Sequence, residues 1–257
     1  MKRRNFLTKS TLATGVFASG LTTLQAQPQP AAKELYELRI YELRWGSDAL
    51  DNYLSKALIP ALNRLGVKRV GAFSQIGDPE PKKIYLLIPY ASFEDYGRIV
   101  YALKTDKEFG EASASYNRIP QGQAVYDRFE SSISVAFDGL PQMPATTSGS
   151  RIFELRTYEG YSEDAVTRKV KMFNDGEFRI FDQVKLNPVF FGETIAGNNL
   201  PCLTYMIWFK DMEERDRNWK AFIEHPDWKK MSADPAYADT VSKIHKVFLK
   251  PASYSQV

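Results

Sequence analysis

The chain has 257 residues, of which 44% are hydrophobic and 25% charged, values typical of a globular protein with one or two domains. Its formal net charge is +3, but four of the 34 basic residues and none of the 31 acidic ones lie within the first 26 positions. The rest of the chain is therefore nearly neutral and lacks the basic surface that indicates nucleic-acid or anionic-membrane binding.

The first 26 residues are predicted to be a signal peptide. Positions 2–4 are basic, a weakly apolar stretch follows, and Leu24–Ala26 offers a cleavage site. The apolar stretch is too short and too rich in Thr and Gly for a membrane span. The segment Arg3–Leu7 resembles a twin-arginine signal, although paired arginines also fit an ordinary basic start. We expect a mature protein that begins near Gln27 and is periplasmic or otherwise extracytoplasmic.

The rest of the chain contains an internal repeat. The segment Tyr36–Glu42 (Tyr-Glu-Leu-Arg-Ile-Tyr-Glu) recurs as Phe153–Glu159 (Phe-Glu-Leu-Arg-Thr-Tyr-Glu). In each copy this strand precedes a helical segment, two strands joined by a turn, further helical segments and a last long strand. The other predicted strands are Val70–Ile76, Ile84–Ile88, Val125–Phe137, Val189–Ile195, Leu203–Phe209 and Val241–Leu249.

The predicted helices have recognisable starts and one apolar face. Ser47, Ser92 and Ser162 are expected N-caps. In the first helix Pro60 should bend or split the helix, and Gly66 suits its end. The apolar face of that helix consists of Leu50, Tyr53, Leu54, Ala57, Leu58, Ala61, Leu62 and Leu65.

Each copy has the order β-α-β-β-α-β, the ferredoxin-like unit. Helices cover one face of such a sheet, and the sheet of the other copy is the nearest partner for the second face. We therefore predict an α+β fold in which two tandem units, residues 33–137 and 151–255, form one barrel within the chain. Residues 138–150, rich in Pro, Gly, Ser and Thr, are expected to be an exposed linker. A homo-oligomer of such barrels is compatible with the sequence.

Several motifs resemble the NIPSNAP family. They are the Glu-Leu-Arg-x-Tyr strand of both copies and the segments Arg217–Trp219, His225–Trp228 and Phe248–Ser255. The resemblance spans nearly all of the mature chain and is clearest over 151–255. The first copy departs from it at Lys104–Phe109, where the second has His-Pro-Asp-Trp. The resemblance implies a dimeric α/β barrel, a group that includes cofactor-free oxygenases, isomerases and haem enzymes. It implies no particular reaction.

Strand alternation suggests binding residues, because consecutive side chains of a strand point to opposite faces. In both copies a Glu, an Arg and a Tyr share one face of the first strand. We expect the apolar set to face the helices and the polar set to line the barrel interior. The ligand-binding candidates are Glu37, Arg39, Tyr41, Glu154, Arg156 and Tyr158.

Two interpretations of these residues remain open. Each Glu could pair with an Arg solely to satisfy a buried charge. Alternatively, the set could line a cavity in which Arg binds a carboxylate or carbonyl group and Tyr supplies a hydroxyl. Arginine has five N–H donors and one carboxylate occupies two, so spare donors would distinguish the second interpretation.

Other chemistry-bearing residues are few. His225 is expected to cap a short helix, whereas His245 is either a satisfied strand residue or a general base. Two histidines and the single Cys202 argue against a usual zinc or copper site, and no haem motif accompanies either histidine. Dinucleotide, phosphate-loop and nucleophile-elbow motifs are absent from the sequence. We expect no metal and no cofactor.

The sequence therefore favours an exported, small-molecule-binding α/β barrel of unassigned activity. One alternative is a cofactor-independent monooxygenase or isomerase that acts on a small enolisable or aromatic substrate. The other is a protein-interaction module. A polar cavity between the sheets would favour the first two functions over the third.

Overall fold

The computed structural model describes residues 32–77, 79–145 and 151–257. The predicted signal peptide lies outside these residues, and the predicted linker is described as far as residue 145.

The first repeat supplies four strands with helices between them. The strands are β1 (Leu35–Leu43), β2 (Gly71–Gln75), β3 (Lys83–Tyr90) and β4 (Tyr126–Ala136). Between β1 and β2 lie α1 (Asp48–Tyr53), the π-helical turn η1 (Leu54–Leu58) and α2 (Ile59–Arg64). Between β3 and β4 lie α3 (Phe93–Thr105), α4 (Lys107–Ala112), α5 (Ala114–Asn117) and the 3-10 turn η2 (Gln121–Gln123).

The second repeat follows the same order. Its strands are β5 (Ile152–Glu159), β6 (Asn187–Ala196), β7 (Cys202–Phe209) and β8 (Lys243–Pro251). Between β5 and β6 lie α6 (Glu163–Met172), the π-helical turn η3 (Phe173–Glu177) and α7 (Phe178–Val184). Between β7 and β8 lie α8 (Met212–Glu224), α9 (Pro226–Ser232) and the 3-10 turn η4 (Pro235–Tyr237).

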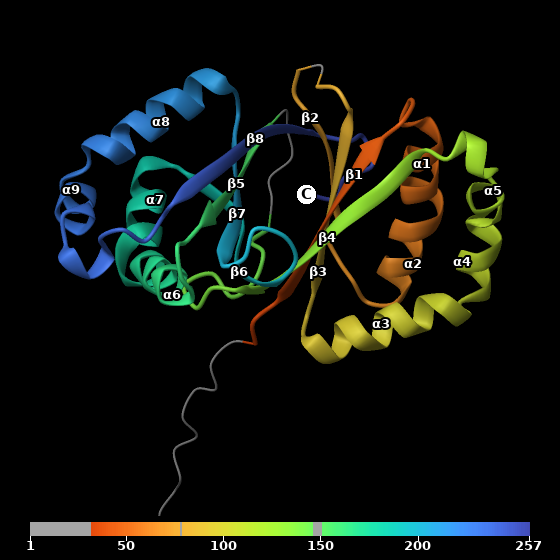
Figure 1. Cartoon of the computed structure of the whole chain (residues 1–257), viewed down its shortest axis with the longest axis horizontal. Coiled ribbons are helices and arrows are strands. Elements are labelled where there is room, and N and C mark those ends of the chain that lie inside the picture. The colour runs from red at the N-terminus through yellow and green to blue at the C-terminus, as the bar shows by residue number, and fades with distance from the viewer. Residues whose placement is uncertain (1–31, 78, 146–150) are drawn as a thin grey trace, which may run out of the picture. The chain divides into compact units, whose positions relative to one another are not determined.

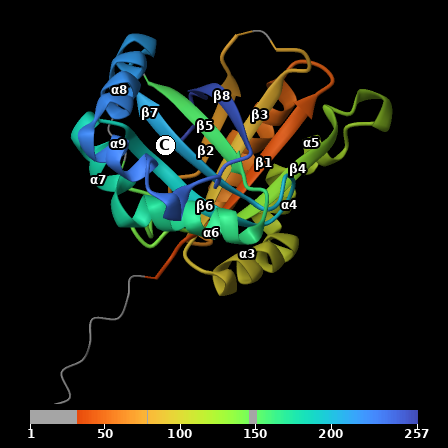
Figure 2. The same ribbon diagram turned by 60° about the vertical axis from the view of Figure 1, so that its left-hand side comes forward.

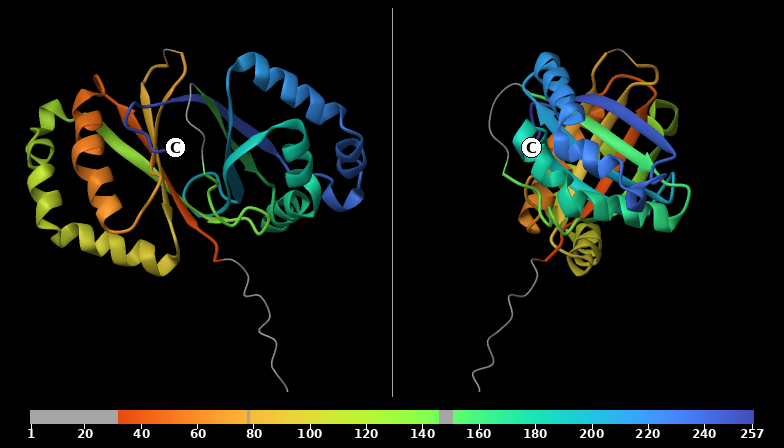
Figure 3. Two further views of the ribbon diagram at one scale, coloured as in Figure 1. Left: turned by 180° about the vertical axis from the view of Figure 1, so that it is seen from behind. Right: turned by 90° about the vertical axis from the view of Figure 1, so that its left-hand side faces the viewer.

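The strands close into one barrel in the order β1-β3-β2-β8-β5-β7-β6-β4, and every neighbouring pair is antiparallel. The two repeats join at two seams, where β2 pairs with β8 and β4 pairs with β6. Figure 1 shows the helices of the first repeat on one flank of the strands and those of the second on the opposite flank. Figure 2 shows strands of both repeats running around the barrel, and Figure 3 shows the same layers from behind. The predicted tandem ferredoxin-like barrel is confirmed.

Local signals explain most helix boundaries. The hydroxyls of Ser92 and Ser162 accept hydrogen bonds from backbone N–H groups three residues on, at 3.1 and 3.2 Å. Ser47 occupies the predicted N-cap position of α1, but its side chain makes no capping hydrogen bond. The predicted interruption near Pro60 is the π turn η1. The second repeat has the matching turn η3 without a proline, so proline is not required for it.

The described part of the predicted linker is not free of the barrel. Met143 is buried against the interior of the barrel, and its backbone N–H donates to Glu34 Oε2 at 2.7 Å. Glu34 in turn donates its own backbone N–H to the carbonyl of Pro141 at 2.8 Å. Asp138, Gly139, Gln142 and Ala145 are exposed, as expected of a linker, whereas Met143 anchors the segment to the barrel.

An apolar cluster fills much of the barrel interior, beside a small cavity that polar side chains also line, and the predicted facing of β1 and β5 is reversed. Tyr36, Leu38, Phe153 and Leu155 point between the two sheets. Aromatic contacts cross between repeats there, with ring centroids 4.8 Å apart for Phe73 and Phe153 and 5.1 Å for Tyr36 and Phe190. The polar set of both strands instead lies on the outer face of the barrel, beneath the helices.

The facing error has a physical cause. Both faces of these sheets are buried, one inside the barrel and one under helices. The alternation of polar and apolar residues therefore assigns side chains to two faces but does not show which face is the inner one. An eight-stranded barrel is just wide enough for side chains to fill it, which leaves little water to solvate a charge. The helices, by contrast, can bring hydrogen-bonding partners to the outer face. The described residues contain no helix that is both long and apolar enough to cross a membrane.

We predict that the inter-repeat aromatic contacts stabilise the whole barrel. Phe153 is fully buried and packs against Phe73 of the other repeat. The Phe153→Ala variant should lose about 3–5 kcal/mol of unfolding free energy in urea denaturation. The control variant Tyr101→Ala, at a side chain that is 71% exposed, should change it by less than about 0.5 kcal/mol. Equal losses would contradict the packing argument.

Candidate functional site

In the first repeat, the predicted polar residues form a closed ion pair. Arg39 donates Nε and Nη2 to the two carboxylate oxygens of Glu37, at 2.6 and 3.0 Å. Glu37 also accepts hydrogen bonds from the hydroxyls of Tyr90 (3.0 Å) and Ser131 (2.8 Å). Burial opposes ionisation of Glu37, but Arg39 and these donors outweigh it and hold the Glu37 pKa below its ordinary value.

Aromatic rings pack beside this pair. Tyr41 lies 5.1 Å from Tyr126 and 4.9 Å from Phe129, measured between ring centroids. The Arg39 guanidinium in turn lies 5.7 Å from the Phe129 ring. The pairing interpretation is therefore the better one for Glu37, Arg39 and Tyr41.

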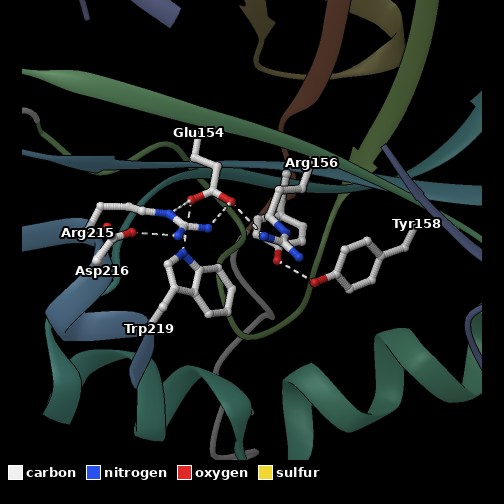
Figure 4. A network of polar contacts seen from close by, with 7 residues as sticks. Glu154, Arg156, Tyr158, Arg215, Asp216 and Trp219 are labelled. Atoms are coloured by element: carbon white, nitrogen blue, oxygen red, sulfur yellow. Dashed lines mark hydrogen bonds and ion pairs between the residues drawn. The ribbon is translucent and has the colours of Figure 1, made fainter. Parts of the chain in front are cut away.

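In the second repeat, the matching glutamate binds two arginines. Glu154 is fully buried and accepts a hydrogen bond from Arg156 Nη1 at 2.6 Å. It also accepts two from Arg215 of α8, at 2.9 and 3.2 Å, and one from Trp219 Nε1 at 2.9 Å. Burial would raise the Glu154 pKa, but these four hydrogen bonds and the two positive charges lower it overall. Figure 4 shows Arg215, Trp219 and Arg156 converging on Glu154.

Arg156 retains donors that Glu154 does not use. Among the described residues, its Nε is buried and has no hydrogen-bond partner. The guanidinium lies 4.6 Å from the Trp219 ring and 5.4 Å from the Tyr158 ring. Glu154 therefore engages Arg156 through one donor only, whereas Glu37 engages Arg39 through two.

A cavity of about 650 Å³ opens beside Arg156, between the outer face of β5, β7 and β8 and helices α6–α9. Its wall is largely aromatic, and it combines four cationic groups with two carboxylates. The aromatic lining includes Tyr158, Phe181, Tyr205, Trp219, Phe222 and Trp228. The charged lining consists of Arg156, Lys169, Glu177, Arg215, Asp239 and Lys246.

The Tyr158 hydroxyl lies against the cavity wall. It shares a hydrogen bond of 2.8 Å with the hydroxyl of Tyr205, and the rings meet edge to face. Burial raises the pKa of both phenols, so both remain protonated at neutral pH. The pair can therefore offer a hydroxyl hydrogen bond to a ligand but no negative charge.

A buried ion pair stands at the helical wall of the cavity. Lys169 of α6 donates its ammonium to Glu177 of η3, and both side chains are at most 6% exposed. Burial raises the Glu177 pKa, and the Lys169 charge only partly offsets this effect. The Lys169 Nζ also lies 3.3 Å from the Met172 sulfur.

His245 lies at a different cavity. Its ring Nε2 pairs with the Glu159 carboxylate, and it lies opposite Thr157 on β5. It lines a space of about 250 Å³ in the barrel interior, together with Ser, Thr and Asn side chains and Cys202. His245 is therefore paired with Glu159 at this interior cavity, and it is not part of the Arg156 cavity. His225 caps α9 as expected, because its Nδ1 accepts the Asp227 N–H at 3.2 Å.

The structure thus divides the six ligand-binding candidates between two places. Glu37, Arg39 and Tyr41 form a packed cluster in the first repeat, while Arg156 and Tyr158 line a cavity in the second, with Glu154 behind them. The described residues hold no cluster of three or more side chains suited to a metal ion.

Sequence reasoning missed Lys169, Glu177 and Arg215. A signal for the first two was present: Ala165, Lys169, Phe173, Glu177 and Phe181 recur every four residues, along one helix face. Charges within such a buried stripe are unusual and point to a special environment. Arg215 had no comparable signal, because the charged segment 213–217 offers several candidates and only packing selects the inward one.

Comparison with known proteins identifies a family for the second repeat, which contains this cavity. Residues 153–256 match the sequence model of the NIPSNAP family. The chain carries a NIPSNAP domain. This NIPSNAP domain contains Arg156, Lys169, Glu177 and Arg215, that is, the cavity and its ion pairs. No curated protein matches the sequence significantly.

Solved structures share the fold of the whole barrel. A candidate monooxygenase from Fusobacterium nucleatum aligns with a TM-score of 0.55 at 10% identity, covering 86% of this chain and 93% of that one. A second, from Lactobacillus acidophilus, aligns at 0.54 and 9% identity, covering 85% and 94%. A NIPSNAP-like domain protein from Burkholderia xenovorans has 20% identity and a TM-score of 0.38, covering 41% and 88%. At these identities the two barrel-wide likenesses show a shared fold.

We predict that the two equivalent arginines differ in their contribution to stability. Arg39→Met leaves the buried Glu37 without a charged partner and should cost about 3–5 kcal/mol of unfolding free energy. Arg156→Met leaves Glu154 with Arg215 and Trp219 and should cost about 1 kcal/mol. Urea denaturation of both variants measures the difference, and equal costs would show that Arg156 is a structural residue like Arg39.

Proposed function

We propose that this protein binds a small aromatic or apolar organic anion in the cavity of its NIPSNAP domain. The observation that carries this proposal is Arg156, which gives only its Nη1 donor to Glu154 and lines a cavity of about 650 Å³. The guanidinium has five N–H donors, so it can also hydrogen-bond to an acceptor group of a ligand in this cavity.

The charge balance favours an anion. Arg156 and Arg215 share the single carboxylate of Glu154, so one buried negative charge faces two positive ones. The further partner of Arg215 is Asp216, a side chain that is 67% exposed and therefore screened by water. A carboxylate ligand at Arg156 would complete the neutralisation and could accept more than one N–H donor.

The lining favours an aromatic or apolar body for this anion. The rings of Tyr158, Trp219 and Trp228 face the cavity, and the exposed Ile223 and Ile244 also line it. Cavities of this size, mostly apolar with a few convergent polar groups, are typical of small-molecule sites. Both the size and the lining suit a ligand that has at least one aromatic ring.

The alternative function is a cofactor-independent monooxygenase or isomerase that uses the same cavity. The two barrel-wide structural relatives are described as candidate monooxygenases, and the Tyr158 and Tyr205 hydroxyls could orient an enolisable substrate. Binding of the anion precedes any such reaction, so the binding experiment applies to both functions.

We predict that benzoate stabilises the protein against thermal unfolding and that Arg156→Met weakens its binding about 10- to 100-fold. Calorimetric titration gives the affinities. Neutral benzamide should bind less tightly than benzoate, because it cannot neutralise Arg156. The matched control is Arg217→Met, on the same helix as Arg215 but with a side chain 63% exposed; it should leave benzoate binding unchanged. Equal affinity for benzoate and benzamide would rule out anion recognition.

We also propose that the mature protein is exported through the twin-arginine pathway. The proposal rests on Arg3–Leu7 and on the signal-like composition of residues 1–26.

We predict that replacing Arg3 and Arg4 by Lys traps the protein in the cytoplasm, because the charge remains while the paired arginines are lost. Cell fractionation and immunoblotting measure the distribution. Deletion of residues 2–26 is the control that should block export by any signal-dependent route. Normal export of the double-lysine variant would show that the basic start acts as an ordinary secretory signal.

A further inference from the structure

The Lys169–Glu177 pair lies on a buried helix face that carries leucines, and no charged residue, in the first repeat. Its stripe reads Ala165, Lys169, Phe173, Glu177, Phe181, with four-residue spacing. The corresponding helix of the first repeat carries leucines at 50, 54, 58 and 62, also at four-residue spacing, and all four are buried. The same fold is therefore built without the ion pair in one half of the chain.

Such a pair is not explained by stability. Desolvating an ammonium and a carboxylate offsets most of their attraction, and apolar replacements of buried pairs are often neutral or stabilising. Glu177 ends the π-helical turn η3, and turns of this kind are frequent at functional sites. The pair is accordingly better explained by a role in the cavity that it lines.

Aromatic rings and one carboxylate surround the Lys169 amine. Its Nζ lies 4.7 Å from the Phe173 ring centroid, 5.4 Å from that of Trp228 and 6.0 Å from that of Tyr158. The nucleophilic form of a lysine is the neutral amine, which forms only when the ammonium gives up a proton. Glu177 stands at hydrogen-bond distance to accept the proton that the ammonium must lose.

Arg156 and Lys169 line the same cavity, and both lie near the Tyr158 ring. The Arg156 guanidinium carbon lies 5.4 Å from the Tyr158 ring centroid and Lys169 Nζ lies 6.0 Å from it. A ligand with a carboxylate at Arg156 and an aromatic ring over Tyr158 could therefore place a second substituent near the Lys169 amine.

We propose that Lys169 forms an imine with the carbonyl carbon of an aromatic aldehyde or ketone that carries a carboxylate. This proposal rests on the proposed anion site at Arg156 and adds the class of ligand that the site takes.

The step balances with the groups present. The Lys169 ammonium gives one proton to the Glu177 carboxylate, and the freed nitrogen lone pair bonds to the carbonyl carbon. A second amine proton moves to the carbonyl oxygen, which gives a carbinolamine. Glu177 returns its proton to that hydroxyl, water leaves, and the nitrogen lone pair forms the C=N bond. The product is an iminium ion that carries the third proton and is paired with the Glu177 carboxylate.

The experiment traps this adduct on the full mature chain. The protein is incubated with 4-carboxybenzaldehyde and sodium cyanoborohydride, which delivers hydride to the iminium carbon and leaves a stable secondary amine. Peptide mass spectrometry locates the label. We expect one label per chain at Lys169, competition by excess benzoate, and at least tenfold less labelling of the exposed Lys171 at the same probe concentration.

Matched variants separate reactivity from folding. Lys169→Arg keeps a cation beside Glu177 but has no nucleophilic amine, and it should abolish the label. Glu177→Gln should slow labelling at least tenfold, because the proton acceptor is lost. The double variant Lys169→Leu with Glu177→Leu, which copies the first repeat, should remain folded by circular dichroism and take no label. Lys171→Arg should label like the natural protein.

Two results would overturn the inference in distinguishable ways. If 4-carboxybenzaldehyde and benzoate both raise the melting temperature but Lys169 is not labelled above Lys171, the imine is wrong and the anion site stands. If neither compound shifts the melting temperature and Lys169 is not labelled, both proposals are wrong.

Discussion

The apolar contact between the two sheets is the constraint on which the rest of the structure depends. Each ferredoxin-like sheet has one face that its own helices cannot cover, and the barrel buries both of these faces against each other. Because rings and aliphatic chains of β1 and β5 make this contact, the side chains that alternate with them, Glu37, Arg39 and their counterparts in β5, lie on the outer face. On the outer face these residues lie beneath the helices. The side chains that the helices supply determine whether the residues form a closed ion pair or line a cavity.

The two repeats show both outcomes for the same Glu-x-Arg-x-Tyr strand. In the first, Glu37 is paired by Arg39 of its own strand and by two hydroxyls of the neighbouring strands, and an aromatic ring packs beside Arg39. In the second, α8 supplies Arg215 and Trp219 to Glu154, which relieves Arg156 of part of its pairing role. An arginine that is no longer needed to neutralise its own glutamate can contact a ligand. The difference between a structural pair and a candidate site therefore comes from the helix and not from the strand motif.

The sequence predicted the barrel well because its signals are local and repeated. Local features identify each unit without long-range information. They are the Glu-Leu-Arg-x-Tyr segment, the turn between the second and third strands of the unit, and the serine at the start of a helix. The facing of β1 and β5 could not be derived in this way. On the outer face Glu154 meets Arg215, which lies 61 residues along the chain, and nothing near Glu154 in the sequence indicates that contact. Lys169 and Glu177 are an intermediate case. The sequence places both on a buried face of a helix, but only the structure shows that this face lines a cavity.

The seams β2–β8 and β4–β6 join two halves that belong to one chain. Because the halves are covalently linked, they need not be identical, and this affects the number of ligand sites per barrel. A barrel made from two identical subunits must present every side chain twice, so each desolvated charge in it is also present twice. In the tandem chain the halves can change independently. Among the described residues, one half has leucines along its first helix, while the other has the Lys169–Glu177 pair beside the Arg156 cavity. A ligand of that cavity should therefore follow a single-site isotherm, without cooperativity between the halves.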